Sequence, residues 1–342
     1  MNKMPSPRWF AGALLLVTTL LVAAGLAEGA QGGAAPPVGQ ATNQVFVSSE
    51  KDDALAVFDA RSRQLVAVWR QCKRPRHLQL SPDRTRLYVA CSDDNRVDVV
   101  DVASRKTVAS LPVGDDPELF DLSRDGRTLY VSNEEDGLLS AYDTASGKRV
   151  FAVRVGEEPE GVKVSADGRH VFVTSEVANL VHVIDVASRK VIRNIQVGNR
   201  PRRLLLVRDG KELWVSNELS ASVSVIRTDT FEVAQTIAFA PRGFRAEDVT
   251  PVGMAASGDG TRAYIGLGRA NHVAVVEVAS RRVQDYVLVG RRAWGLALSR
   301  DNARLYVANG LSDDVSVVDT ASRRAVATLK AGRVPHSVAI DD

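Results

Sequence analysis

The chain has 342 residues, of which 45% are hydrophobic and 25% are charged, and its formal net charge is +3. This apolar content is enough for a substantial core in a single domain. Two of the positive charges, Lys3 and Arg8, belong to an N-terminal leader, and the nearly neutral remainder excludes the basic signature of a nucleic-acid-binding protein.

The leader has the pattern of a secretory signal peptide. Its basic residues precede an apolar stretch over residues 9–26, and small residues follow, with cleavage expected after Ala27 or at Ala30. A membrane anchor is the alternative, because the stretch approaches the length of a spanning helix. We expect a signal peptide over residues 1–27 and a flexible linker over residues 28–43, and a mature protein that is not embedded in the membrane.

From residue 44 onward the chain repeats one pattern. The aromatic residue of a "LYVSN"-like segment recurs seven times, 42 residues apart except for one gap of 50, at Phe46, Tyr88, Tyr130, Phe172, Trp214, Tyr264 and Tyr306. A proline that opens the next apolar run shows the same spacing, and the extra eight residues lie between Ile226 and Pro251. A period of about 40–45 residues is typical of propeller blades with four strands each.

The segments within each repeat read as short strands. Runs such as "VSVVDT" at residue 315 are β-branched or alternate with a period of two, and "SRDGR" at residue 123 is a hairpin signal. The first repeat lacks a first strand, and residues 333–342 supply one. The sequence therefore predicts an all-β fold over residues 44–342: a seven-bladed β-propeller of four-stranded antiparallel blades, closed by a C-terminal strand that completes the first blade.

Several segments resemble a known family. "LYVSN", "LYVAN" and "VFVTS" are similar to the YVTN family of β-propeller repeats, and "DPELF" at residue 116, "EPEGV" at 158, "KELWVSNE" at 211 and "YVLVGRRAW" at 286 sharpen the resemblance. With these segments the chain resembles the seven-repeat propellers associated with PQQ-dependent alcohol catabolism. The resemblance implies a periplasmic protein encoded beside an ABC transporter and quinoprotein dehydrogenases, and it brings no catalytic residues.

Candidate site residues lie where the repeats differ. The start of each first strand, the end of each second strand and the links between blades meet at one face, around the mouth of the central channel. There we expect a polar funnel that takes a polar ligand or a partner loop, although a solvated rim would look similar; its residues are Arg76, His77, Glu118, Glu160, Glu176, Arg202, Arg203, Trp294 and His336.

The chemistry of this funnel stays open at the level of the sequence. Glu118 and Glu160 could form an acid/base pair, but no nucleophile or oxyanion motif accompanies them. His77 and His336 could both reach the channel, and two histidines are too few for a metal site. We therefore expect no metal and no cofactor.

Two further features lie near the mouth. We expect the insertion to fold over or beside the mouth as a partial lid that includes Phe244 and Arg245, with Phe244 turned inward, the alternative being a disordered tip. Cys72 and Cys91 lie at the same end of the second blade, close enough for a disulfide in an oxidising compartment. Two unpaired thiols, or a reactive or copper-binding pair near His77, are the alternatives.

Two classes of function follow. The favoured hypothesis is a non-catalytic binding or accessory propeller, a monomer that serves quinoprotein-dependent alcohol oxidation and contacts a quinoprotein dehydrogenase, a transporter component or a small polar ligand. The alternative is a hydrolase or lyase, most plausibly a lactonase, because related seven-bladed propellers host such activities at the channel mouth. Turnover would distinguish the enzyme from the accessory protein.

Overall fold

The computed structural model describes residues 40–342. The expected signal peptide and most of the expected linker lie outside the described residues. Within residues 40–342 no helix is long and apolar enough to cross a membrane.

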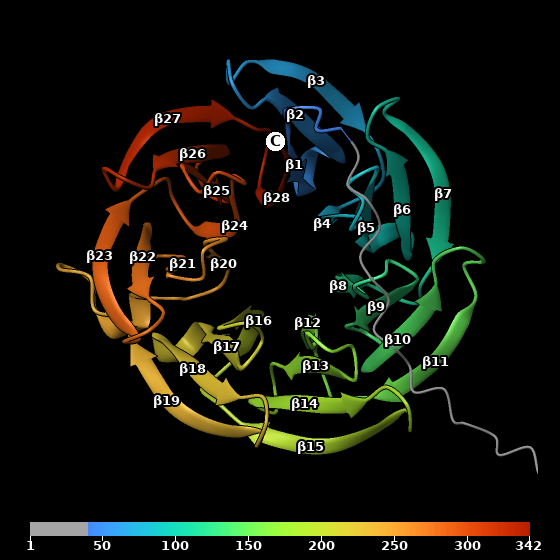
Figure 1. Cartoon of the computed structure of the whole chain (residues 1–342). Coiled ribbons are helices and arrows are strands. Elements are labelled where there is room, and N and C mark those ends of the chain that lie inside the picture. The colour runs from blue at the N-terminus through green and yellow to red at the C-terminus, as the bar shows by residue number, and fades with distance from the viewer. Residues whose placement is uncertain (1–39) are drawn as a thin grey trace, which may run out of the picture. The chain divides into compact units, whose positions relative to one another are not determined.

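Seven four-stranded antiparallel sheets are arranged radially around a central channel, which confirms the predicted propeller (Figure 1). The strands of blades 1 to 3 are, from the channel outward, β28 (Pro335–Asp341), β1 (Gln44–Ser49), β2 (Ala54–Asp59) and β3 (Leu65–Arg70); β4 (Pro75–Leu80), β5 (Arg86–Cys91), β6 (Arg96–Asp101) and β7 (Lys106–Pro112); β8 (Pro117–Leu122), β9 (Thr128–Asn133), β10 (Leu138–Asp143) and β11 (Arg149–Arg154).

Blades 4 to 7 repeat this order. Their strands are β12 (Pro159–Val164), β13 (His170–Ser175), β14 (Leu180–Asp185) and β15 (Lys190–Gln196); β16 (Pro201–Val207), β17 (Glu212–Asn217), β18 (Ser222–Arg227) and β19 (Glu232–Ala238); β20 (Met254–Ala256), β21 (Arg262–Gly266), β22 (His272–Glu277) and β23 (Arg282–Leu288); β24 (Ala293–Leu298), β25 (Arg304–Asn309), β26 (Asp314–Asp319) and β27 (Arg324–Lys330).

Single-turn 3-10 helices occur only on the connections of the described residues: η1 (Glu50–Asp52), η2 (Ser92–Asp94), η3 (Glu218–Ser220) and η4 (Ala246–Asp248).

The hairpin turns follow the Asp-Gly signal. Between β8 and β9, Gly126 adopts a φ of 71° and its N–H donates to the Ser123 carbonyl at 2.8 Å. The Ser123 hydroxyl donates to Asp125 at 2.6 Å, so the polar residues of the motif complete the turn.

The ring closes as predicted. β28 pairs antiparallel with β1, with Gln44 opposite Asp341 and Val45 opposite Ile340. Thr42 also donates from its N–H and its hydroxyl to the Asp341 carboxylate, at 2.7 Å each. The two ends of the described chain therefore complete one blade.

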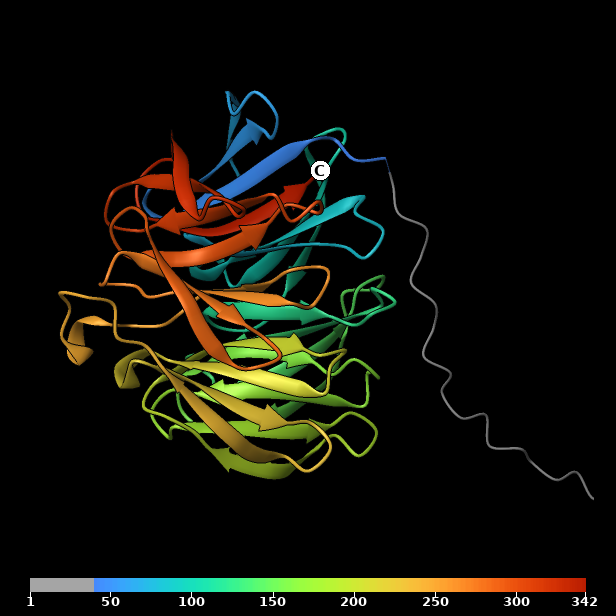
Figure 2. The ribbon, with the colours of Figure 1, turned by 60° about the vertical axis from the view of Figure 1, so that its left-hand side comes forward.

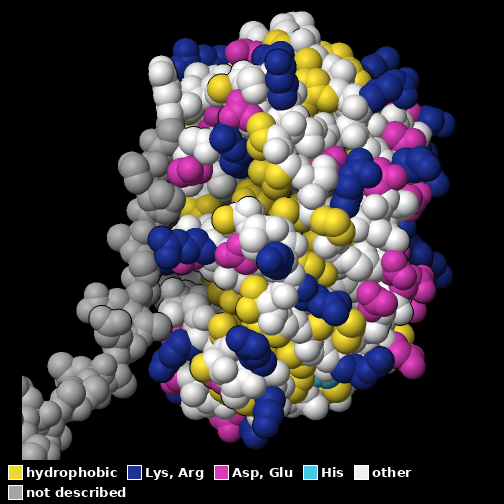
Figure 3. Space-filling model, turned by 90° about the vertical axis from the view of Figure 1, so that its right-hand side faces the viewer, with side chains coloured by type: hydrophobic (Ala, Val, Ile, Leu, Met, Phe, Trp, Pro, Cys, Tyr) yellow, Lys and Arg dark blue, Asp and Glu magenta, His cyan; other side chains and the backbone are white. Residues whose placement is uncertain are grey.

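The core lies between neighbouring blades. Each of the seven repeat aromatics is buried, with at most 7% of its surface exposed, as expected for residues that pack one blade on the next. The outer strands keep some apolar side chains in solvent, among them Val66, Val68, Val108 and Val150. Figure 3 shows hydrophobic side chains exposed between charged groups on one side of the molecule.

The insertion projects from one face of the ring (Figure 2). It lies between β19 and β20 and contains η4. In Figure 1 it extends away from the channel, beside the outer strands of blades 5 and 6. It therefore stands beside the channel mouth and does not cover it.

Candidate functional site

A register shift in the first strand of six blades aims the candidate residues. In blades 1 to 5 and 7 the pairing slips between the first residue of the inner strand and the fourth, for example between Pro75 and Leu78 of β4. Such a bulge re-aims side chains locally. Here it sends the residue after the proline, such as Arg76, toward the channel mouth and the next residue, such as His77, toward the interior.

Hydrogen bonds between blades hold the aimed residues in place. The Ser132 hydroxyl of β9 donates to the Glu160 carbonyl in the next blade at 2.6 Å, and Ser48 and Thr174 make the same bond to Arg76 at 2.7 Å and to Arg202 at 3.1 Å. These hydroxyls occupy the serine position of the "LYVSN" repeat. The repeat therefore positions the variable residues of the neighbouring blade.

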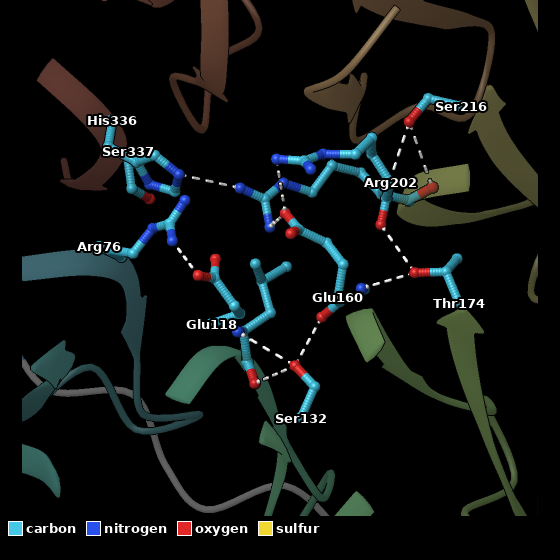
Figure 4. Close-up of polar contacts among 12 residues, drawn as sticks. Arg76, Glu118, Ser132, Glu160, Thr174, Arg202, Ser216, His336 and Ser337 are labelled. Carbon is cyan, nitrogen blue, oxygen red and sulfur yellow. Dashed lines mark hydrogen bonds and ion pairs between the residues drawn. The ribbon is translucent and has the colours of Figure 1, made fainter. Parts of the chain in front are cut away.

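The aimed side chains form a buried ion-pair network across the channel (Figure 4). Arg76 pairs with Glu118, and Arg203 Nη1 lies 2.9 Å from Glu160 Oε1. Arg203 Nη2 also lies 3.2 Å from His336 Nε2. This layer of Arg76, Glu118, Glu160, Arg203 and His336 joins blades 2, 3, 4, 5 and 1, and it is called the ion-pair layer below.

Glu160 of this layer and Glu176 beside it differ sharply in the proton affinity of their carboxyl groups. Arg202, Arg203 and Arg76 lower the pKa of Glu160 to about 2, against the opposing effect of its burial. Burial and the charge of Glu160 raise the pKa of Glu176 to about 8, although Arg202 and Arg200 oppose this. The two carboxyl groups interact, so their protonation is coupled.

The pKa of Glu160 bears on the acid/base pair that the sequence suggested. Glu160 is held ionised, and Glu118 is fully buried against Arg76. Arginines engage both carboxylates, so the structure gives no support to this pair as an acid/base couple.

A cavity of about 290 Å³ opens above the ion-pair layer, and it is called the mouth cavity. Its lining is mostly charged: Glu50, Arg74, Arg76, Glu134, Glu160, Arg200, Arg202, Arg292, Trp294, Gly310, Val334, Pro335 and His336. Among residues 40–342, every Arg or Glu of this set has an ion-pair partner within 4.0 Å except Glu134 and Arg292. These two stand on opposite sides of the ring, after β9 in blade 3 and before β24 in blade 7.

Glu134 and Arg292, which are called the free charges below, differ in their surroundings. Burial, Glu160 and Asp116 raise the pKa of the Glu134 carboxyl above its ordinary value. The Arg292 guanidinium lies 4.4 Å from the ring centroid of Trp294, on which Arg202 also stacks at 5.1 Å. The indole Nε1–H of Trp294 is buried and has no hydrogen-bond partner among the described residues. Because this atom is buried, its donor stays unsatisfied within the described structure.

A second cavity, of about 240 Å³, lies on the other side of the ion-pair layer, and it is called the inner chamber. Its polar residues are His77, Gln79, Asp121, Lys163, Arg203, His336 and Ser337. The two histidines named from the sequence thus both line the channel, with Arg203 beside them. Burial, Arg203 and Lys163 lower the pKa of His77 to about 3, so this imidazole stays neutral at physiological pH.

One group of carboxylates could hold a metal ion. Asp116, Glu118 and Glu134 offer oxygens within 4.8 Å of one another. Arg74 pairs with Asp116 at 3.2 Å and Arg76 with Glu118, so two cations already balance this group. We assign no metal to it.

The insertion differs from the expected lid. The Phe244 ring packs edge-on against His272, with 5.4 Å between the ring centroids, and contacts the core cluster between blades 5 and 6. Arg245 pairs with Asp248 at 3.0 Å within the insertion. Neither residue lines the mouth cavity, so the expectation that Phe244 turns toward the channel is wrong: an apolar ring gains more from the blade interface than from a charged opening.

The two cysteines form a disulfide. Cys72 in the link before β4 is joined to Cys91 at the end of β5, with a Cα–Cα distance of 5.6 Å. Both are buried. The bond fixes the link that carries Arg74 and Arg76, and it removes the thiol and copper-binding alternatives for this state of the protein.

The sequence placed Glu134 at the rim of the channel mouth and Arg74 in the link beside it, but neither was chosen as a site residue, and Arg292 and Arg200 were not chosen either. All four follow the second strand or precede the first strand, at the face where the sequence placed the site. Which of them stays unpaired depends on neighbours across the ring, and no local pattern encodes that.

Two family models match parts of the chain. The model described as a lactonase with a 7-bladed beta-propeller matches residues 188–340, and a YNCE-like beta-propeller model matches residues 158–208. We found no curated protein with a significant match. The matches support a β-propeller, and none supports the narrower resemblance to the propellers of PQQ-dependent catabolism.

Solved structures agree on the fold. The periplasmic gluconolactonase PpgL of Pseudomonas aeruginosa superposes with a TM-score of 0.74 at 22% identity, covering 87% of this chain and 99% of that one. A provisionally named 6-phosphogluconolactonase from Bacteroides fragilis NCTC 9343 gives 0.72 at 16% identity, covering 88% and 99%. Kuenenia stuttgartiensis hydrazine synthase gives 0.73 at 22% identity, covering 83% and 94%. At these identities the likeness shows the fold alone, and one fold hosts different chemistry.

Proposed function

We propose that the protein is a hydrolase that opens a small polar lactone in the mouth cavity. The observation that carries this proposal is the pair of free charges, Glu134 and Arg292, which face one cavity whose other acidic and basic side chains are paired. The partial match to the lactonase family model and the likeness to a gluconolactonase support the same choice.

Glu134 is suited to act as the general base. A base works best when its pKa lies near the working pH, and the environment of Glu134 moves its pKa in that direction. In its ionised form the carboxylate accepts a proton from a water molecule, and the oxygen of that water attacks the lactone carbonyl carbon.

Arg292 is suited to hold the carbonyl oxygen, with its guanidinium packed against the ring of Trp294. The negative charge that develops on this oxygen would be stabilised by the Arg292 guanidinium. Collapse of the tetrahedral intermediate breaks the ring C–O bond. The proton taken by Glu134 passes to the leaving alkoxide, and the product is a hydroxy acid, which ionises.

The cavity also favours a particular substrate class. Its volume of about 290 Å³ is at the lower end of small-molecule sites. Its paired arginines and glutamates offer donors and acceptors to hydroxyl groups. These features fit the lactone of a polyhydroxylated acid better than a long-chain lactone.

The test is turnover by matched variants. Wild-type protein should hydrolyse a polyhydroxylated lactone, followed as acid release after subtraction of the spontaneous rate. Glu134→Gln should lower kcat/KM by about 100-fold or more, because general base catalysis contributes about that much. Glu135→Gln removes an adjacent exposed carboxylate outside the mouth cavity and should retain wild-type rates.

The opposite outcome identifies the other class of function. Saturable binding of lactones without turnover would contradict the enzyme and support the non-catalytic accessory protein. In that case, capture of a quinoprotein dehydrogenase or a transporter component would supply the partner that the sequence resemblance implied.

We also propose that the leader exports the protein to the periplasm, where an oxidising environment would maintain the Cys72–Cys91 disulfide. Fractionation of cells that express the full chain tests this proposal. A processed protein in the periplasmic fraction is expected, and an unprocessed protein in the cytoplasm would contradict it.

A further inference from the structure

The inner chamber is separate from the mouth cavity. Of the residues that line the two cavities, only His336 belongs to both, and the ion-pair layer lies between them. A ligand in one cavity would therefore not occupy the other. The proposed hydrolysis uses only the mouth cavity.

One wall of the inner chamber has unused hydrogen-bonding capacity. Asp121 accepts bonds from Gln79 at 2.8 Å and from the Val164 N–H at 2.9 Å, and it pairs with Lys163 Nζ at 3.0 Å. Its carboxylate is thus fully engaged. Lys163 has this single partner among the described residues, so two of its three ammonium donors remain available. About 32% of its side chain is exposed, so solutes can reach it.

The unused cationic donors of the inner chamber favour an anion. Its lining holds two cations, Lys163 and Arg203, and one carboxylate, Asp121, and Arg203 pairs with Glu160 of the ion-pair layer. Burial lowers the pKa of His77 most, and Arg203 and Lys163 lower it further against the opposing effect of Glu160. His77 makes no hydrogen bond to the described residues, so its ring N–H can donate to a ligand, and only its contact with Phe120, at 4.8 Å between ring centroids, orients it.

The opposite wall is apolar. Leu204 of blade 5, Met254 of blade 6 and Leu296 of blade 7 face the chamber where blades 2 to 4 present polar groups. The free ammonium donors of Lys163 opposite an apolar wall suit a singly charged anion that has a short hydrocarbon chain. The volume of about 240 Å³ accommodates such a small ligand.

We propose that the inner chamber is a second binding site, which takes a short-chain monocarboxylate. The carboxylate contacts Lys163 and His77, and the hydrocarbon chain lies against Leu204, Met254 and Leu296. This site goes beyond the proposed hydrolysis and does not depend on it.

The test uses butyrate as the probe and histidine signals as the readout. The chain has five histidines, so the imidazole NMR spectrum of the full-length protein can be assigned with a His77→Gln variant. Butyrate should shift the His77 signals saturably and leave His170 and His272 in place. Butyramide, which has the same shape without the charge, should bind at least about tenfold more weakly, because the charged hydrogen bonds are lost.

Variants separate the site from a general salt effect. Lys163→Met should weaken butyrate binding by about tenfold or more, Lys163→Arg should restore most of it, and Lys190→Met, at an exposed lysine of β15, should change nothing. Equal binding of butyramide and butyrate, tighter binding of inorganic phosphate than of butyrate, or unchanged binding by a folded Lys163→Met protein would each overturn the proposal. Glu134→Gln should bind butyrate like the wild type, so failure of the hydrolase proposal leaves this test intact.

Discussion

Glu160 and Glu176 show how the same side chain acquires opposite properties within one network. Glu160 lies among Arg76, Arg202 and Arg203 and is held ionised, whereas Glu176 is buried beside that charge and holds its proton more tightly. Removing one partner of a buried ion pair leaves the other partner as an uncompensated charge. Replacing a buried carboxyl group that is protonated by a neutral amide leaves no such charge. The two glutamates should therefore respond in opposite ways to the same substitution.

Glu160→Gln should lower the free energy of unfolding by about 3–5 kcal/mol, because Arg202 and Arg203 lose their shared carboxylate. Glu176→Gln should be neutral or stabilising by about 1 kcal/mol at neutral pH, since the amide imitates the protonated acid. Urea denaturation of both variants measures the difference. A larger loss for Glu176→Gln than for Glu160→Gln would contradict this account.

The pH dependence of the free energy of unfolding provides a second test of the difference between Glu160 and Glu176. The pKa of Glu176 is raised in the folded protein, so its ionisation destabilises the fold as the pH rises through about 8. Glu176→Gln should therefore gain more stability relative to the wild type at pH 8 than at pH 5. The pKa of Glu160 is lowered to about 2, so its stabilising contribution is present above its ordinary pKa and is lost as the pH falls.

At the scale of elements, the first strands show what the sequence could and could not predict. The repeated proline that opens each apolar run correctly predicted that the residues after it, Arg76, His77, Arg202 and Arg203, lie at the channel. The bulge that sends neighbouring residues to two different cavities could not be foreseen, because it depends on how the second strand pairs. The sequence placed Glu134 at the rim but could not show that Glu134 and Arg292 stay unpaired, because distant blades decide which charges pair.

The insertion yields a prediction that differs from that of a lid. Phe244→Ala should lower the free energy of unfolding by about 1–2 kcal/mol, because a partly buried ring leaves the interface of blades 5 and 6. The KM for a lactone should not change, since Phe244 does not line the mouth cavity. Arg242→Ala, at the exposed tip, should alter neither quantity. A raised KM with unchanged stability for Phe244→Ala would support the lid instead.

At the scale of the whole molecule, the sequence predicted most of the architecture. The seven repeats with a period of 42 residues specify the number of blades. The incomplete first and last repeats specify the closure, because a blade without its first strand would expose the unpaired backbone N–H and C=O groups of an edge strand. The site is harder to predict, because side chains from blades 1, 2, 3, 4, 5 and 7 meet only after the ring has closed. Its chemistry is a property of the ring and not of any one repeat.

Closure should therefore be required for folding. Removal of residues 335–342 deletes β28, exposes the edge of β1 and removes Val338 and Ile340 from the core between blades 1 and 7. We expect circular dichroism and thermal unfolding to show no cooperative transition. Removal of Asp342 alone, which leaves β28 whole, should leave the melting temperature within a few degrees of the wild type. A truncated protein with a normal transition would show that the ring does not need its closing strand.

The central claim is that Glu134 activates water in the mouth cavity, and a pH–rate profile tests it most directly. With spontaneous hydrolysis subtracted, kcat/KM of the wild type for a polyhydroxylated lactone should rise with pH through an apparent pKa above the ordinary glutamate value, because burial and neighbouring carboxylates raise the pKa of Glu134. Glu134→Gln should abolish this rise, and Glu135→Gln should preserve it. A Glu134→Gln protein with the wild-type profile, or a wild-type protein that binds lactones without hydrolysing them, would contradict the account.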